Sequence, residues 1–161
     1  MDYKRPKEKI HPKAIKAWRV GGCIYFAFYI FIIIGFIVSS RLWGPFPNFI
    51  LWILMSLAIV LGLLNIFIIP SIRKRYWCYE IKEYEVDIQY GILVVKRSLI
   101  PMAKIQHVDT EQGPILRYFQ LATLSISTAG TNHKIPALKM EKALELRKQI
   151  STLARINDEE I

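Results

Sequence analysis

The most prominent pattern in the chain is a pair of long apolar runs separated by one charged residue. Residues 20–40 contain no Asp, Glu, Lys or Arg, and neither do residues 42–72 on the other side of Arg41. A helix needs roughly 20 residues to cross the hydrocarbon core of a bilayer, which is about 30 Å thick. Core helices of globular domains are usually shorter and carry a polar stripe, which both runs lack. The pattern therefore predicts two membrane-spanning helices, over residues 20–40 and 49–70.

This helical hairpin divides the chain into five segments. A basic N-terminal arm with a short interfacial helix is expected over residues 1–19, and its first ten residues are expected to be mobile. The link at residues 41–48 is too short to hold an external domain, and residues 71–161 form the domain that follows the spans. Because the first run exceeds the roughly 7–15 apolar residues of a signal peptide, it should remain in the mature protein.

Beyond Arg75 the apolar positions change to a period of two, which is typical of β-strands. The alternation is clearest at residues 85–90 and 121–127, and shorter extended segments are predicted at residues 76–82, 92–95, 105–110 and 133–135. A short helical turn is expected at residues 115–119. The chain then ends in an amphipathic helix whose apolar face contains Met140, Ala143, Leu146, Ile150 and Leu153. This succession predicts a small antiparallel sheet or open barrel capped by one helix.

The formal net charge of +9 comes from the N-terminal arm and the ends of the two runs. From residue 76 onward eleven basic residues balance eleven acidic ones, so this domain lacks the basic surface that nucleic-acid binding requires. Lys and Arg collect at the cytoplasmic ends of membrane spans, which predicts that both termini are cytoplasmic. The basic arm is also expected to contact anionic membrane lipids.

Candidate catalytic chemistry is sparse. His107 and Asp109 lie two apart on an expected strand, where they would share a face and could form an acid–base pair or two ligands of a metal. No third partner stands at a recognisable spacing, and His133 is distant in sequence. Cys23 and Cys78 form no expected disulfide on the reducing side of the membrane. The sequence therefore predicts no catalytic site, no metal site and no cofactor.

Polar and small residues within the spans suggest where helices meet. Asn65 is strongly polar, so it should face protein, either the first helix or another subunit. Two pairs of small residues four apart, Gly35 with Ser39 and Ala58 with Gly62, have the spacing that lets helices approach closely in lipid.

Four motifs follow one another in the C-terminal half of the chain. They are Ile100-Pro-Met-Ala-Lys-Ile-Gln-His-Val-Asp109, Gly113-Pro-Ile-Leu-Arg117, Leu121-Ala-Thr-Leu-Ser-Ile-Ser-Thr-Ala-Gly130 and Ile135-Pro136. With the basic arm and the two spans before them, they resemble the YdbS family of bacterial pleckstrin-homology-like (PH-like) domain proteins, and the resemblance covers nearly the whole chain. It implies an α+β membrane protein in the bacterial inner membrane, in which a transmembrane hairpin precedes a cytoplasmic PH-like antiparallel barrel with a C-terminal helix.

The resemblance also implies a partner, because proteins of this family look like small companions of a larger multi-span membrane protein with several copies of the same domain. Leu116, Leu121, Leu124 and Ile126 are expected to fill the core. Arg117 is expected to pair with Asp109 or Glu111, and a role in subunit contact is the alternative. With Asn65 in the spans, the candidate partner-contact or motif residues are Gln106, His107, Asp109, Gly113, Pro114 and Arg117.

Three functions remain to be weighed. The favoured one is a non-enzymatic membrane subunit whose PH-like domain binds that partner protein. The alternative is an envelope-defence or lipid-handling complex acting through the spans, with protection against membrane-active peptides as the role toward which the resemblance points. The third, an enzyme using His107 and Asp109, has little support. Specific phosphoinositide binding is disfavoured because the turn at residues 82–85 is net negative. A homo-oligomer is a further alternative, since an open barrel leaves strand edges that need cover.

Overall fold

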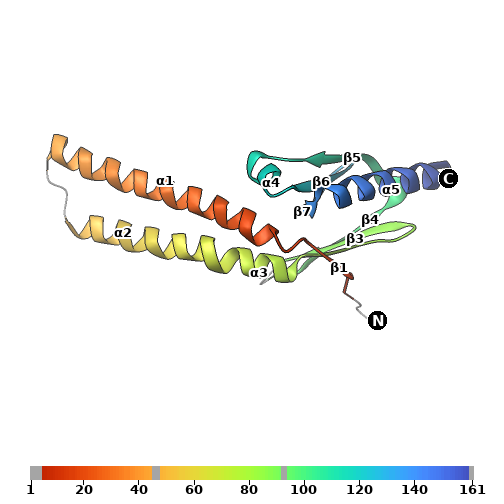
Figure 1. The fold of residues 1–161 in the computed structure, drawn as a ribbon, viewed down its shortest axis with the longest axis horizontal. Coiled ribbons are helices and arrows are strands. Elements are labelled where there is room, and N and C mark those ends of the chain that lie inside the picture. Colours follow the sequence, from red (N-terminus) through yellow and green to blue (C-terminus); the bar gives the residue numbers. More distant parts are fainter. Residues whose placement is uncertain (1–4, 45–47, 92–93, 160–161) are drawn as a thin grey trace. The chain divides into compact units, whose positions relative to one another are not determined.

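The computed structural model describes residues 5–44, 48–91 and 94–159. The chain divides into two compact units. Lys16–Ser71 forms the first, the helical unit, and the residues on either side of it form the second, the sheet domain. Figure 1 shows the long helices of the helical unit in orange and yellow, and the strands and C-terminal helix of the sheet domain in green and blue.

Two long apolar helices confirm the predicted spans. The first is α1 (Ala14–Trp43), and the second is continuous through α2 (Asn48–Leu63), a π-helical turn η1 (Leu64–Ile68) and α3 (Ile69–Tyr76). Only 6% and 11% of the residues in their most apolar stretches are buried, which distinguishes them from core helices of a globular domain. The first helix extends beyond the predicted residues 20–40 at both ends, and residues 45–47 of the expected link lie outside the described residues.

The second helix does not stop at Pro70, where the apolar pattern suggested an end. Proline lacks an N–H donor and normally kinks or ends a helix. Here a π turn directly precedes it, and the backbone N–H of Ile69 bonds to the carbonyl of Leu64. Two side chains satisfy nearby carbonyls: Asn65 Nδ2 donates to Leu61 at 2.8 Å, and Ser71 Oγ donates to Phe67 at 2.8 Å. The helix therefore continues to Tyr76.

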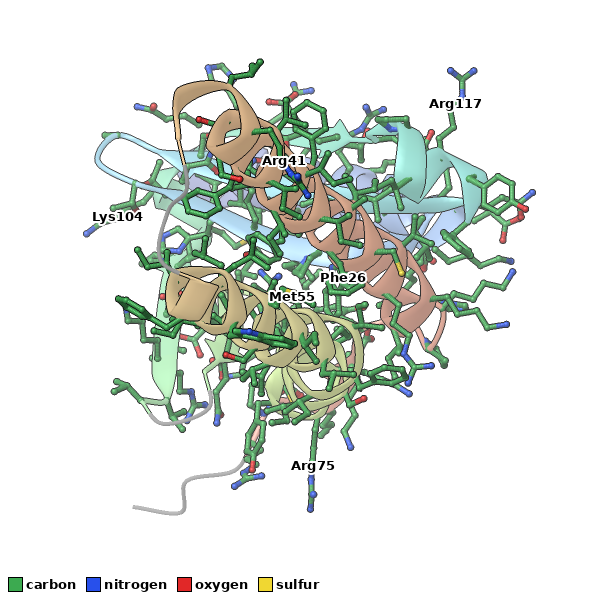
Figure 2. The ribbon with its side chains drawn as sticks, turned by 90° about the vertical axis from the view of Figure 1, so that its left-hand side faces the viewer. Phe26, Arg41, Met55, Arg75, Lys104 and Arg117 are labelled. Atoms are coloured by element: carbon green, nitrogen blue, oxygen red, sulfur yellow. The ribbon has the colours of Figure 1, made fainter. Side chains whose placement is uncertain are left out.

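Two glycines form the close contacts between the helices of the hairpin. A Cβ added to Gly62 would lie 2.3 Å from a ring carbon of Phe26, and one added to Gly22 would lie 2.9 Å from the carbonyl oxygen of Asn65. Figure 2 shows Phe26 between the two helices. Gly35 has nothing within 4 Å of its added Cβ, so the expected close contact at Gly35 is not formed within the hairpin. Gly62 meets an aromatic ring, whereas no described side chain faces Gly35.

The sheet domain contains two antiparallel sheets. The first has the order β1-β2-β3-β4, and the second has the order β5-β6-β7. The strands are β1 (Glu8–Lys9), β2 (Cys78–Ile81), β3 (Glu85–Tyr90), β4 (Lys96–Pro101), β5 (Ile105–Glu111), β6 (Leu121–Thr128) and β7 (Asn132–Lys139). Three helices complete the domain: the 3-10 turn η2 (Met102–Lys104), α4 (Pro114–Tyr118) and α5 (Met140–Glu159). Among the described strands no ladder joins the two sheets, so the predicted PH-like barrel is open.

The core of the domain lies between the sheets and α5. Its fully buried side chains include Leu121, Leu124 and Ile126 of β6, as predicted, whereas Leu116 of α4 is only half-buried. The amphipathic pattern of the last helix is confirmed, since α5 buries Ala143, Leu146 and Ile150.

The strand predicted at residues 92–95 is not formed at Val94 and Val95. Val94 and Val95 precede β4 and are exposed, while Ile92 and Leu93 lie outside the described residues. The reason is Gly91, whose φ of +115° turns the chain at the end of β3. The paired strand therefore begins only at Lys96, which lies opposite Tyr90.

Candidate interaction surface

Residues 5–10 of the N-terminal arm, which were expected to be mobile, are part of the sheet domain. Glu8 and Lys9 pair with Tyr79 and Cys78 as an added edge strand. Ile10, the next residue, is 2% exposed. Burial raises the pKa of the Tyr79 phenol, and its hydrogen bond with the Glu8 carboxylate raises this pKa further. Backbone pairing and an apolar anchor thus attach the arm to the sheet, although it is separated from β2 by both spans.

His11 occupies the junction between this strand and the first helix. Its backbone N–H donates to the carbonyl of Ala137 at 3.2 Å, and its ring Nδ1 accepts from the backbone N–H of Lys13 at 3.2 Å. Burial lowers the pKa of His11, and the positive charges of Lys13, Lys139 and Lys74 lower it further. The neutral imidazole is therefore the form that caps the first turn of α1.

Asp87 is the most deeply buried charged residue in the described part of the chain. It is 0% exposed, although the alternation of β3 assigns it to the polar face. Arg97 of β4 donates from Nε to Oδ1 at 2.9 Å and from Nη2 to Oδ2 at 2.5 Å. The sequence could have indicated this pair, because Asp87 and the basic residue Arg97 lie on two successive strands of a hairpin. The fork of bonds makes the pair a structural support of the sheet.

Three of the predicted site residues lie on β5. Gln106, His107 and Asp109 are all exposed, and no charged partner of His107 or Asp109 is found among the described ion pairs. A register shift between Ile105 and His107 marks a bulge in this strand. Within the described residues no group of three or more His, Cys, Asp or Glu could hold a metal ion. These exposed polar side chains along β5 can therefore form hydrogen bonds with a molecule that contacts the strand.

The three candidate residues of the second motif belong to a short helix and its N-cap. Gly113 is the N-cap residue of α4, Pro114 is its first residue, and the backbone N–H of Arg117 bonds to the carbonyl of Gly113 at 2.9 Å. The Arg117 side chain is exposed and points away from the ribbon (Figure 2). Glu111 instead pairs with Lys134 at 2.7 Å, so the expected Arg117–Glu111 ion pair is not formed.

A groove runs between β5 and the C-terminal half of α5. It has a volume of about 810 Å³, and Gln106 and His107 line one side of it while Ser151, Ala154 and Arg155 line the other. Ala103, Ile105 and Val108 complete its lining. We call this feature the β5–α5 groove. Sequence patterns alone do not predict it, because the strand ends at Glu111 and the helix begins only at Met140.

Asn65 lies in the helical unit, remote in sequence from the β5 residues. Its side chain bonds within its own helix, to the Leu61 carbonyl, and its backbone carbonyl packs on Gly22 of α1. The residue is half-buried. Its polar side chain is therefore satisfied inside the hairpin, at the π turn.

The sequence was compared with known proteins and families. A family model described as "Bacterial PH domain" matches residues 25–154. The UPF0699 transmembrane protein YdbS of Bacillus subtilis is 44% identical over 157 residues, which are 98% of each chain. The UPF0699 transmembrane protein YdbT of the same organism is 30% identical over 99 residues, which are 58% of this chain and 20% of YdbT. No solved structure matches significantly.

These matches agree with the architecture. The relatives are named for their transmembrane character, and this chain has two helices of sufficient length and apolarity to span a membrane. The family model and YdbS each cover most of the chain, and they confirm the resemblance inferred from the four motifs. The chain therefore belongs to the UPF0699 family of transmembrane proteins and carries a bacterial PH domain.

Proposed function

We propose that this protein is a non-enzymatic membrane subunit whose PH domain binds a longer membrane protein carrying the same kind of domain. Both termini are proposed to be cytoplasmic, because Lys and Arg gather at both ends of the hairpin while the link carries only Arg41. The PH domain would then meet its partner at the inner face of the membrane.

The observation that carries this proposal is the β5–α5 groove. It is open to solvent and combines apolar lining from Ile105 and Val108 with polar groups from Gln106 and His107. Such a mixture suits a protein segment, whose apolar side chains fill the groove while polar groups set its register. Among the described strands β5 pairs only with β6, so its outer edge has backbone groups available for an added strand.

The nature of the partner is suggested by the longer relative. YdbT is similar to this chain over 99 residues that make up only 20% of its length. A second protein with a similar domain can present strand edges that match those of the first. We therefore assign the groove to a domain of such a longer protein.

A binding role is also favoured over catalysis by the surroundings of the two candidate residues. His107 and Asp109 are exposed on an edge strand. Catalytic acids and bases are commonly tuned by burial or by a close charged neighbour. Exposed side chains on an edge strand are instead well placed to contact a second protein.

The test is affinity purification of the tagged full-length protein from its native membranes in mild detergent. Three chains are compared: the unmodified protein, Ala103→Glu in the groove and Ala129→Glu in the turn after β6. Ala103 and Ala129 are both exposed, so the two substitutions are matched in chemistry and in expected effect on folding. Thermal unfolding of each purified chain verifies that the fold is retained.

We expect a longer membrane protein with a PH domain to copurify in stoichiometric amount with the unmodified chain and with Ala129→Glu, and to be lost with Ala103→Glu. Equal recovery with both variants would show that the groove is not the contact. If the protein is recovered alone or as a homo-oligomer in every mild detergent, the subunit proposal fails. Action of the spans on lipid or on membrane-active peptides then becomes the leading account.

A further inference from the structure

The residue that joins the second apolar helix to the first long strand is Trp77. The last turn of α3 before it carries the three basic residues 73–75. Basic residues at the end of a span lie at the lipid headgroups. Because a helix rises only about 1.5 Å per residue, Trp77 follows Arg75 within a few ångströms. This position marks where the sheet domain begins relative to the membrane surface.

The register of the first sheet places the far end of β3 next to Trp77. β2 leads away from Trp77, and β3 returns antiparallel to it with Gln89 opposite Cys78. Tyr90 directly follows Gln89, and Trp77 directly precedes Cys78. The Tyr90 and Trp77 rings stack with centroids 4.8 Å apart and planes inclined by 15°. The end of β3 therefore lies beside the residue that directly follows the second apolar helix.

Two exposed valines lie directly before β4. Val94 and Val95 are 69% and 54% exposed, and Lys96 directly after them is exposed as well. We call these three residues the valine tip. Gly91 at the end of β3 lies close to the tip, because a Cβ added to Gly91 would clash with the carbonyl oxygen of Val94. The stack at Tyr90 and the close approach at Gly91 both hold the tip at the end of the sheet.

The other end of the same strand has the opposite character. The turn between β2 and β3 contains Glu83 and leads into Glu85, and its exposed aromatic residue is Tyr84. An anionic membrane surface repels acidic groups and attracts Lys. The two ends of the first sheet therefore differ: the end near Trp77 is apolar and basic, and the turn at residues 82–85 is net negative, although Lys82 in it pairs with Glu85.

We propose that the valine tip inserts into the lipid interface, so that the PH domain is held at the membrane by a contact additional to its helices. The occupant of this surface is lipid, because the tip follows Tyr90, which stacks on the residue directly after the end of a span, and because the tip combines exposed valines with a basic residue. Apolar side chains flanked by Lys are the composition of segments that lie in the headgroup and acyl boundary. The proposal is independent of the partner assigned to the β5–α5 groove.

The experiment places an environment-sensitive fluorophore at either end of the sheet. In a Cys23→Ser background, Val95→Cys carries the label at the tip and Tyr84→Cys carries it at the acidic turn. Cys78 is buried, and the background chain without an added cysteine checks that it takes up no label. The purified full-length protein is placed in vesicles of equal parts phosphatidylethanolamine and phosphatidylglycerol. Quenching is measured with aqueous iodide and with lipids bearing a doxyl group near the headgroup.

We expect the label at position 95 to be quenched several-fold more strongly by the doxyl lipid than the label at position 84, and the order to reverse with iodide. Val94→Asp should return the label at position 95 to water, which shows that the protein and not the fluorophore drives insertion. Equal iodide quenching at both ends would overturn the proposal, and so would lipid quenching that survives Val94→Asp. A label that is in water in the purified protein but shielded in native membranes would identify a protein contact, which also overturns it.

Discussion

Arg97 on β4 holds the buried carboxylate of Asp87 on β3 through charge-assisted hydrogen bonds to both carboxylate oxygens. Its Nε lies 2.9 Å from Oδ1 and its Nη2 lies 2.5 Å from Oδ2. The Asp87 side chain is completely buried, while that of Arg97 keeps 21% of its surface exposed. A carboxylate removed from water needs such a partner, because its desolvation is not otherwise compensated.

Loss of this partner should strongly destabilise the PH domain. Arg97→Ala leaves the Asp87 carboxylate buried and unpaired, and we expect a loss of about 3–5 kcal/mol in the free energy of unfolding. Chemical denaturation of the full-length protein in detergent measures it. Lys134→Ala, which breaks the exposed pair with Glu111, should cost only about 0–1 kcal/mol. Similar costs for the two variants would refute the supporting role of the Asp87–Arg97 pair.

The attachment of the N-terminal arm can be tested at Ile10, which is 2% exposed. Ile10→Ala should lower the free energy of unfolding by about 2–5 kcal/mol, the usual cost of removing a buried aliphatic side chain. Lys9→Ala, at the exposed neighbouring position, serves as the control and should change stability little. An arm that does not belong to the domain would show no difference between these variants in thermal unfolding.

His11 should make the junction between β1 and α1 sensitive to acid. Its pKa in the folded protein lies below the ordinary value of 6.5, so the unfolded chain binds a proton more readily. The stabilisation is therefore complete above pH 6.5 and is lost as the pH falls through that value toward the lowered pKa. Amide hydrogen exchange at Lys13, corrected for its intrinsic pH dependence, should speed up over this interval. In His11→Asn the pH response should disappear, and its persistence would assign it to another group.

Packing of the helical hairpin depends on which glycine is enlarged. Gly62→Val places atoms where the Phe26 ring lies, and overpacking of this kind typically costs about 1–3 kcal/mol. Gly35→Val meets open space and should leave the hairpin unchanged. Thermal unfolding in detergent, followed by circular dichroism at a helical wavelength, compares the two. A larger loss for Gly35→Val would instead place a helix contact on that face.

Arg117 provides a test for the second motif. Its exposed side chain has no role in the pairing of Glu111, which binds Lys134. Arg117→Ala should therefore change the free energy of unfolding by less than about 0.5 kcal/mol, as is usual for surface positions. Chemical denaturation measures this value. A substantially larger loss would mean that Arg117 supports the fold, as an intramolecular ion pair would require.

Local pattern was sufficient for the spans, for most strands and for the last helix. Residues 20–40 and 42–72 lack charge over lengths that match a bilayer, and the period of two at residues 85–90 and 121–127 matches β3 and β6. These predictions succeed because a strand or helix that buries one face has apolar residues at regular intervals along the chain. The motif residues on β5 were found, but the position of β5 at the edge of a sheet was not, since an edge strand carries no distinct local repeat.

What the sequence by itself determined is the set of apolar helices, the alternating strands and the distribution of charge, because each depends on residues close together in the chain. Only the tertiary structure decided that Glu8 pairs with Tyr79, that Asp87 is buried beside Arg97 and that β5 and α5 form a groove. A two-residue strand is too short to show a period, and a carboxylate on the polar face of a strand is buried only when a neighbouring strand supplies its partner. Such contacts join distant residues, and their energies are set by the folded arrangement.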